Sequence, residues 1–143
     1  MFNKDILTIN ESKFCIAVGV LSERLAYYNT ALKFYSKALS KSFSAYLYYR
    51  KIKIYIILKD YINTLLQLAT FLSCISEDDL ISFNKVPDWI KKTVLLLLKE
   101  IEIKEIFNIL LDCPKYIIDY LNKIIENTHN YWIKHNHDID VLK

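Results

Sequence analysis

Few residues in this chain have the types and spacing that metal chemistry requires. The nearest approach is a short string near the C-terminus, with His135, His137, Asp138 and Asp140. Two histidines two positions apart in a polar terminal segment would hold a transition metal only weakly, and a solvated tail explains them more simply. The sequence therefore predicts no metal site.

Catalytic groups are equally scarce. Glu100, Glu102 and Glu105 are spaced like a solvated helical corner rather than like a paired acid and base. The chain has one glycine, which leaves no glycine-rich phosphate loop, and no nucleophile has a base nearby in the sequence. We expect no catalytic residue and no cofactor.

The cysteines indicate a cellular setting. Cys15, Cys74 and Cys113 are odd in number, far apart and surrounded by apolar residues, which is typical of reduced core cysteines rather than of a disulfide framework. The N-terminal residues contain early charges and no cleavable apolar segment, and no stretch is long and apolar enough to span a bilayer. A cytoplasmic protein without a membrane span is expected, with the nucleus as the alternative location.

A basic, tyrosine-rich segment is the strongest chemical signal. Seven cations and no acid lie between Lys33 and Lys59, interleaved with tyrosines, and Lys33, Lys37 and Lys41 would form a ridge along one helix. Cations along a path with stacking aromatics suit single-stranded nucleic acid. However, arginine is preferred for phosphate and base contacts, and the chain has only two arginines, at 24 and 50. Nucleic-acid binding is therefore the alternative function.

Charge is distributed unevenly around this segment. Residues 1–75 contain ten basic and four acidic residues, whereas residues 76–143 contain nine and twelve. Such an asymmetry indicates different neighbours at the two ends of the chain.

The elements that position these residues should all be helices. With one glycine and two prolines among 143 residues, the chain has few of the turn residues that end strands and form hairpins. Its apolar residues follow a helical period. Ser12 should cap the first helix and Asp60 the fourth, and Pro87 should begin the fifth at its first position. The expected helices span 12–24, 28–41, 45–58, 61–74, 88–100, 103–112 and 116–134, with a short turn over 76–83.

Two of these helices repeat. The stretches 28–39 and 61–72 occupy equivalent places in a period of about 33 residues. In the first stretch Ala31, Tyr35 and Ala38 are spaced so that the small residues and the ring share one face. A period of this length indicates stacked helix–turn–helix units, which form surfaces rather than reaction centres.

These residues resemble the tetratricopeptide repeat (TPR) family. The resemblance implies a single all-α domain, a right-handed stack of two to three TPR-like hairpins closed by a C-terminal capping helix. The units would be repeat 1 at 12–44, repeat 2 at 45–78, a degenerate repeat 3 at 87–113, a capping helix at 114–134 and a tail at 135–143. Thr64 and Phe71 replace alanines of the family pattern, so the helices of repeat 2 should pack less closely.

The resemblance also implies an interaction surface, because the first helix of each TPR unit lines a concave face. The partner-binding residues implied are Lys13, Ile16, Val20, Tyr46, Tyr49, Arg50, Lys53 and Ile56. Ile16 and Val20 stand where the family's carboxylate clamp needs Lys and Asn, so that clamp is not expected. The predicted function is a non-catalytic adaptor, or a structural subunit of a multi-subunit complex, that docks a protein partner's peptide or helix; a homodimer through the last helix is the alternative assembly.

Overall fold

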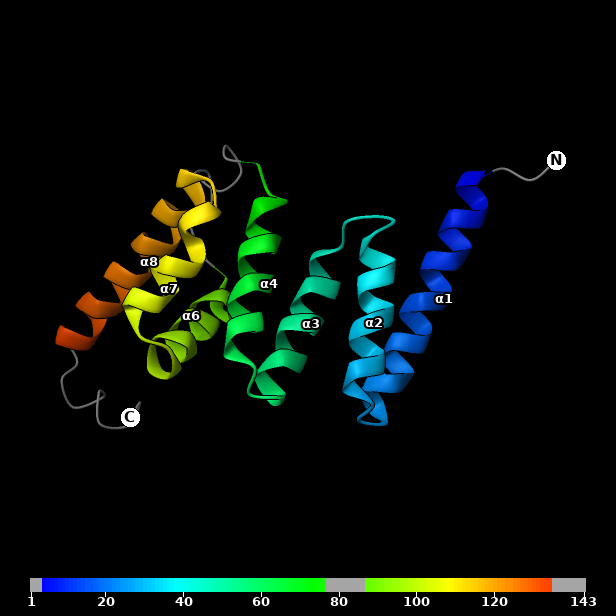
Figure 1. Ribbon diagram of the computed structural model, residues 1–143, viewed down its shortest axis with the longest axis horizontal. Helices are drawn as coiled ribbons and strands as arrows, with labels where there is room; N and C mark the ends of the chain where they lie inside the picture. The colour runs from blue at the N-terminus through cyan, green and yellow to red at the C-terminus, as the bar shows by residue number, and fades with distance from the viewer. Residues whose placement is uncertain (1–3, 77–86, 135–143) are drawn as a thin grey trace. The chain divides into compact units, whose positions relative to one another are not determined.

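The computed structural model describes the backbone of residues 4–76 and 87–134, and the side chains of residues 10–76 and 87–127. Every regular element in these ranges is a helix, which confirms the predicted all-α class (Figure 1). The helices are α1 (Lys4–Arg24), α2 (Tyr28–Leu39), α3 (Ala45–Ile57), α4 (Tyr61–Ser73), α6 (Asp88–Glu100), α7 (Ile103–Ile109) and α8 (Lys115–Lys134). A 3₁₀ turn, η1 (Leu110–Asp112), continues α7.

Most helix ends lie within two residues of the prediction, and two do not: the start of α1, and the end of α7, where the 3₁₀ turn η1 replaces the last part of the predicted helix. Pro87 is the N-cap of α6 rather than its first residue. Ser12 was expected to cap the first helix, but α1 begins at Lys4 and Ser12 lies inside it. No glycine or proline precedes Ser12 to stop the helix, so the cap prediction was wrong. The turn expected over 76–83 and the tail 135–143, with its two histidines, lie outside the described residues.

Polar caps begin two of the helices. The hydroxyl of Ser44 accepts a hydrogen bond from the amide of Leu47 at 3.3 Å and starts α3. The carboxylate of Asp60 accepts one from the amide of Asn63 at 3.2 Å and starts α4, as predicted. Each cap satisfies an amide that the first helical turn leaves without a partner.

The corners that precede α2 and α4 have the same backbone structure. Ala26 and Lys59 adopt left-handed conformations, with φ of 63° and 58°. The amide that follows each one reaches back to the preceding helix, from Tyr27 to the carbonyl of Ser22 and from Asp60 to that of Tyr55. This is the hydrogen-bond pattern of a Schellman cap, here built without glycine. The two corners lie one sequence period apart.

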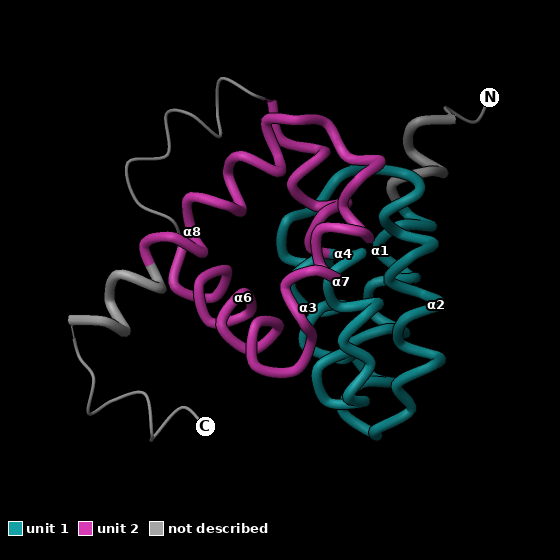
Figure 2. Tube along the Cα trace, turned by 60° about the vertical axis from the view of Figure 1, so that its left-hand side comes forward, with its two compact units in different colours: residues 1–67 teal, residues 68–143 magenta. Residues whose placement is uncertain are grey.

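The chain divides into two compact units, Met1–Gln67 and Leu68–Lys143, which we call unit 1 and unit 2 (Figure 2). The division falls within α4. The range predicted for repeat 2, 45–78, therefore includes residues of both units.

The core of unit 1 corrects the prediction for the first helix. The helical period of the sequence puts Phe14, Leu21 and Leu25 on or near one apolar face with Cys15 and predicts that this face is buried, but their exposed fractions are 64%, 59% and 56%. The neighbouring face, with Cys15, Gly19 and Ser22, is buried instead. These small side chains let the α2 backbone approach closely, so α1 packs through them and leaves its larger apolar residues exposed.

Gly19 marks the closest point of this packing. A Cβ atom at Gly19 would lie 2.5 Å from Cε1 of Tyr35, a distance at which the ring would have to move. Ala31 and Ala38, on either side of Tyr35 along α2, are fully buried. The spacing of small and aromatic residues read from the sequence thus corresponds to a real contact between α1 and α2.

The face of α3 that carries Leu47 and Ile54 completes this core. In α4, Thr64 is fully buried, and its hydroxyl donates to the carbonyl of Asp60 at 2.8 Å.

Unit 2 has its own apolar core. Its buried residues include Ile90, Val94 and Leu97 of α6, Ile106 and Leu110 at α7 and η1, and Ile117, Leu121 and Ile124 of α8. The backbones of α6 and α8 lie close together, and the rings of Phe71 and Trp89 lie 5.5 Å apart. The apolar run at 95–98 predicts a deeply buried helix, but of its four leucines only Leu97 is buried. The other three are half-buried because successive helical residues face different directions.

The cysteines are all free thiols, as predicted, but only Cys15 is in the core. Cys113 is half-buried and Cys74 is exposed, so the expectation that all three are core residues was wrong for Cys74. Within the described residues, no helix is both long enough and apolar enough to cross a membrane.

Candidate interaction surface

One side of α3 carries a row of partly exposed side chains. Tyr46, Arg50, Lys53 and Ile57 are spaced by four, three and four residues, so they follow one line along the helix. Tyr46 is 58% exposed and Ile57 is 53% exposed, while Lys53 is exposed and Arg50 partly so. We call these four residues the α3 row. Because α3 has no acidic residue, the row combines apolar area with positive charge only.

The middle of the α3 row is held from beneath by Glu23 of α1. Nε of Arg50 donates a hydrogen bond to Oε1 of Glu23 at 3.1 Å, and the guanidinium also pairs with Oε2. The hydroxyl of Tyr35 donates to the same Oε1 at 2.8 Å. Residues from α1, α2 and α3 therefore meet in one charged network.

This network is largely removed from water. The Glu23 side chain is only 10% exposed, that of Arg50 is 32% exposed, and Tyr35 is fully buried. Burial raises the pKa of the Tyr35 phenol above its ordinary value, and the nearby phenol of Tyr46 raises it further, so the phenol stays protonated and can donate. Bidentate pairing uses only part of the guanidinium, which leaves Arg50 further N–H donors in a fixed orientation.

Tyr49 flanks the α3 row. Nζ of Lys53 lies 5.5 Å from the centre of the Tyr49 ring, within the range of a cation–π contact. At an exposed site such a contact contributes about 0.5–1 kcal/mol. Lys53 is therefore oriented over an aromatic surface while its charge remains open to solvent.

The other residues predicted for this surface take different positions. Lys13 is exposed on α1, whereas Ile16 and Val20 are half-buried and pack against the core of unit 1. Ile56 is also half-buried. Only parts of these three apolar side chains are available to a partner.

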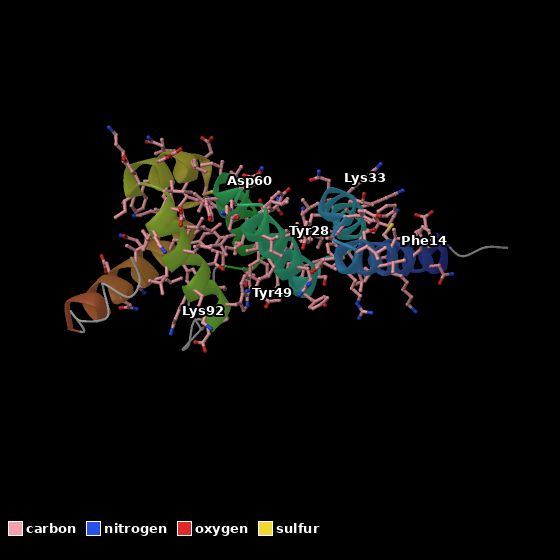
Figure 3. The ribbon with its side chains drawn as sticks, turned by 90° about the horizontal axis from the view of Figure 1, so that it is seen from below. Phe14, Tyr28, Lys33, Tyr49, Asp60 and Lys92 are labelled. Atoms are coloured by element: carbon pink, nitrogen blue, oxygen red, sulfur yellow. The ribbon has the colours of Figure 1, made fainter. Side chains whose placement is uncertain are left out.

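The basic ridge of α2 is separate from the α3 row. Lys33 and Lys37 are exposed, and Lys41 pairs with Glu11 at 2.8 Å. The hydrogen bond and charge of Lys41 lower the pKa of Glu11, and Glu11 correspondingly raises the pKa of Lys41. The side chains of Lys33 and Tyr49 lie on opposite sides of unit 1 (Figure 3). The cations that are continuous in the sequence do not form one continuous surface.

Lys51 is the unexpected member of the cationic segment. It is only 6% exposed and lies between Leu47 and Ile54 on the face of α3 that joins the core. No acidic side chain lies within ion-pairing distance among the described residues, and burial lowers the pKa of its ammonium group. The side chain of Lys51 is therefore not available to contact a partner.

No three His, Cys, Asp or Glu side chains in the described part of the chain are grouped to hold a metal ion. Glu100, Glu102 and Glu105 are all exposed, as expected for a solvated corner.

Two features of the surface were missed from the sequence. Ile57 joins the α3 row, and its spacing from Tyr46 and Lys53 could have shown this. The contact between Glu23 and Arg50 joins residues 27 positions apart. No local pattern signals that contact, because it depends on how α3 packs against α1.

The chain was also compared with known proteins. No protein-family model, no curated protein and no solved structure matches it. Its function has to be inferred from its own residues.

Proposed function

We propose that this protein is a non-catalytic interaction protein, either an adaptor or a structural subunit of a larger complex, and that it docks a peptide or helix of a partner protein on the α3 row. The observation that carries the proposal is the anchoring of Arg50 by Glu23 beneath exposed Tyr46 and Lys53. Tyrosine and arginine are enriched at protein interfaces, where they bury large areas and donate hydrogen bonds.

Pre-organisation supports this choice. Arg50 is already fixed by Glu23, and Lys53 lies over the ring of Tyr49. A partner that contacts these groups would lose less side-chain entropy than on a surface of free lysines. The α3 row is therefore better suited to selective docking than the exposed ridge of α2.

We also propose that unit 1 begins a TPR-like stack. The close approach at Gly19 and the two Schellman caps one period apart are the observations that favour it. In such a stack α1 and α3 would line the same concave side, and α8 would close the other end. Lys13, Ile16, Val20 and Ile56 would then border the docking surface.

Nucleic-acid binding through residues 33–59 remains the alternative, favoured by the exposure of Lys33 and Lys37 on a helix without acids. Four observations weigh against it. Of the seven cations, Lys51 is buried, Arg50 is bound by Glu23 and Lys41 is bound by Glu11. Tyr35 is fully buried as well and cannot stack on a base.

Affinity capture from native extract tests the proposal, with the full chain carrying Tyr46→Ala and Lys53→Ala as the test variant. Both side chains extend outward, so the variant should keep its helical circular dichroism and lose the captured partner. The matched control carries Lys33→Ala and Lys37→Ala on the exposed face of α2 and should keep the partner.

Equal capture by both variants would place the interface elsewhere. Single-stranded RNA should not bind the full chain near physiological salt. A micromolar affinity that falls steeply with added salt, and that the Lys33→Ala/Lys37→Ala variant loses, would favour the alternative function.

A further inference from the structure

The surface of unit 1 has a consistent charge imbalance. No acidic residue occurs between Arg24 and Lys59. The three acidic side chains between residues 10 and 67 are already bound within the unit: Glu11 to Lys41, Glu23 to Arg50, and Asp60 to the amide of Asn63. Among the side chains described in unit 1, the remaining exposed lysines therefore have no free carboxylate to neutralise them.

On the α3 row this positive charge lies beside apolar area. Lys53 is exposed, with its aliphatic chain and ammonium near the Tyr49 ring. Tyr46 and Ile57, both more than half exposed, lie one turn or more away on either side of it along the helix. A segment that covers the row meets, in order, an aromatic ring, a fixed guanidinium, a free ammonium and an aliphatic side chain.

From this charge complementarity we infer that the partner segment on the α3 row is an acidic peptide in which apolar residues flank a carboxylate. The inference rests on the proposed docking function and names the chemistry of its partner. The carboxylate meets Lys53 and accepts from the N–H groups of Arg50 that Glu23 leaves open. The flanking apolar side chains cover Tyr46 and Ile57.

The two cations have different tasks in this arrangement. Because Glu23 neutralises Arg50, the guanidinium adds no net charge to the surface. Its remaining N–H donors orient the bound carboxylate. Lys53 has no acidic partner among the described residues and supplies the charge that selects an anionic segment. A basic segment would place like charges together at Lys53, which disfavours binding.

Selection of peptides from a random displayed library tests this inference on the full chain. The library carries random segments of about a dozen residues, long enough to follow the length of α3. We expect the selected peptides to be enriched in Asp or Glu next to Phe, Tyr, Leu or Ile. Their affinity should fall as salt is added, because the charge on Lys53 is exposed to solvent.

Charge reversal makes the test specific. Lys53→Glu should weaken the selected acidic peptides by about tenfold or more and should select basic peptides when the library is screened again. Lys33→Glu, the same reversal on the opposite side of unit 1, should leave both results unchanged. Both positions are exposed, so circular dichroism should show the same helix content in the two variants.

Several outcomes would overturn the inference. If the selected peptides were neutral or basic, the inference of an acidic partner would be wrong, while docking on the α3 row would still stand. Equal effects of Lys53→Glu and Lys33→Glu would show that only overall charge matters. Absence of any enriched peptide would also overturn it, and the capture experiment with the Tyr46→Ala/Lys53→Ala variant would then decide the docking function independently.

Discussion

Lys51 and Arg50 are neighbours in α3 with opposite surroundings. Arg50 points toward Glu23 and gains a paired carboxylate, whereas Lys51 is buried and has no acidic partner among the described residues. Removing an ammonium group from water without a compensating charge is unfavourable. Lys51 should therefore reduce the stability of unit 1, and a hydrophobic residue of similar length should fit its site better.

Replacement of Lys51 by Met should raise the free energy of unfolding by about 1–2 kcal/mol near neutral pH. The folded state lowers the pKa of Lys51, so between that pKa and the unfolded value of about 10.4 the unfolded chain binds more protons. The wild type therefore gains stability as pH rises through this window, and the advantage of Lys51→Met should shrink there. Urea unfolding at neutral and alkaline pH measures both effects.

The exposed Lys53 provides the matched control, since Lys53→Met removes the same charge from the same helix without relieving burial. Lys53→Met should not raise the free energy of unfolding by a comparable amount. If Lys51→Met destabilised the protein, or if its advantage grew with pH, Lys51 would have a stabilising partner in solution.

At the scale of the element, α1 shows that an apolar stripe does not by itself identify the buried face. The helix has a large-residue stripe with Phe14 and Leu21 and a small-residue stripe with Cys15 and Gly19. The small stripe is the buried one, because it allows α2 to approach closely enough for the Tyr35 ring to cover Gly19. Closer packing brings more atoms of the two helices into contact, and this compensates for the smaller apolar area of each side chain.

Gly19→Ala should therefore destabilise the protein, although alanine favours helix. Overpacking against Tyr35 costs about 1–3 kcal/mol, against a helix-propensity gain of about 1 kcal/mol. In a Tyr35→Leu background the ring is gone, and the same Gly19→Ala change should become neutral or stabilising. Chemical denaturation of the four proteins of this double-mutant cycle measures the coupling.

The exposed Ala17 supplies the control for helix propensity, because Ala17→Gly should cost only about 1 kcal/mol in either background. A stabilising effect of Gly19→Ala in the presence of Tyr35 would show that α1 and α2 are not held at this separation.

The whole molecule consists of two compact units that share one continuous helix, α4. The network of Glu23, Tyr35 and Arg50 lies entirely in unit 1, and the packing of α6 with α8 lies entirely in unit 2. Because each unit has core contacts of its own, local opening should occur separately in the two units.

Hydrogen exchange of the full chain should show this separation. Gly19→Ala should lower the protection of amides in α1, α2 and α3 and leave α6 and α8 nearly unchanged. Ile124→Val, which removes one buried methyl group from α8 at a cost of about 1 kcal/mol, should have the converse effect. A uniform loss of protection in both variants would mean that the chain unfolds as one cooperative unit.

The helical class and most helix ends could be read from the sequence because they depend on local chemistry. The scarcity of glycine and proline allows helices to continue, and polar residues such as Asp60 and Ser44 occur where the backbone needs a cap. The shared face of Ala31, Tyr35 and Ala38 on α2 could also be read, since these residues are spaced at helical intervals.

Which residues meet across helices was decided only by the tertiary structure. Periodicity placed the large apolar residues and Cys15 of α1 on one face and could not show which of them is buried. It also could not show that Arg50 pairs with Glu23 while adjacent Lys51 is buried with no acidic partner among the described residues. The physical reason is that the helical period describes only the directions of side chains around one helix axis. Burial and ion pairing depend on the distance and angle between two helix axes, and close contacts such as that of Gly19 with Tyr35 set these.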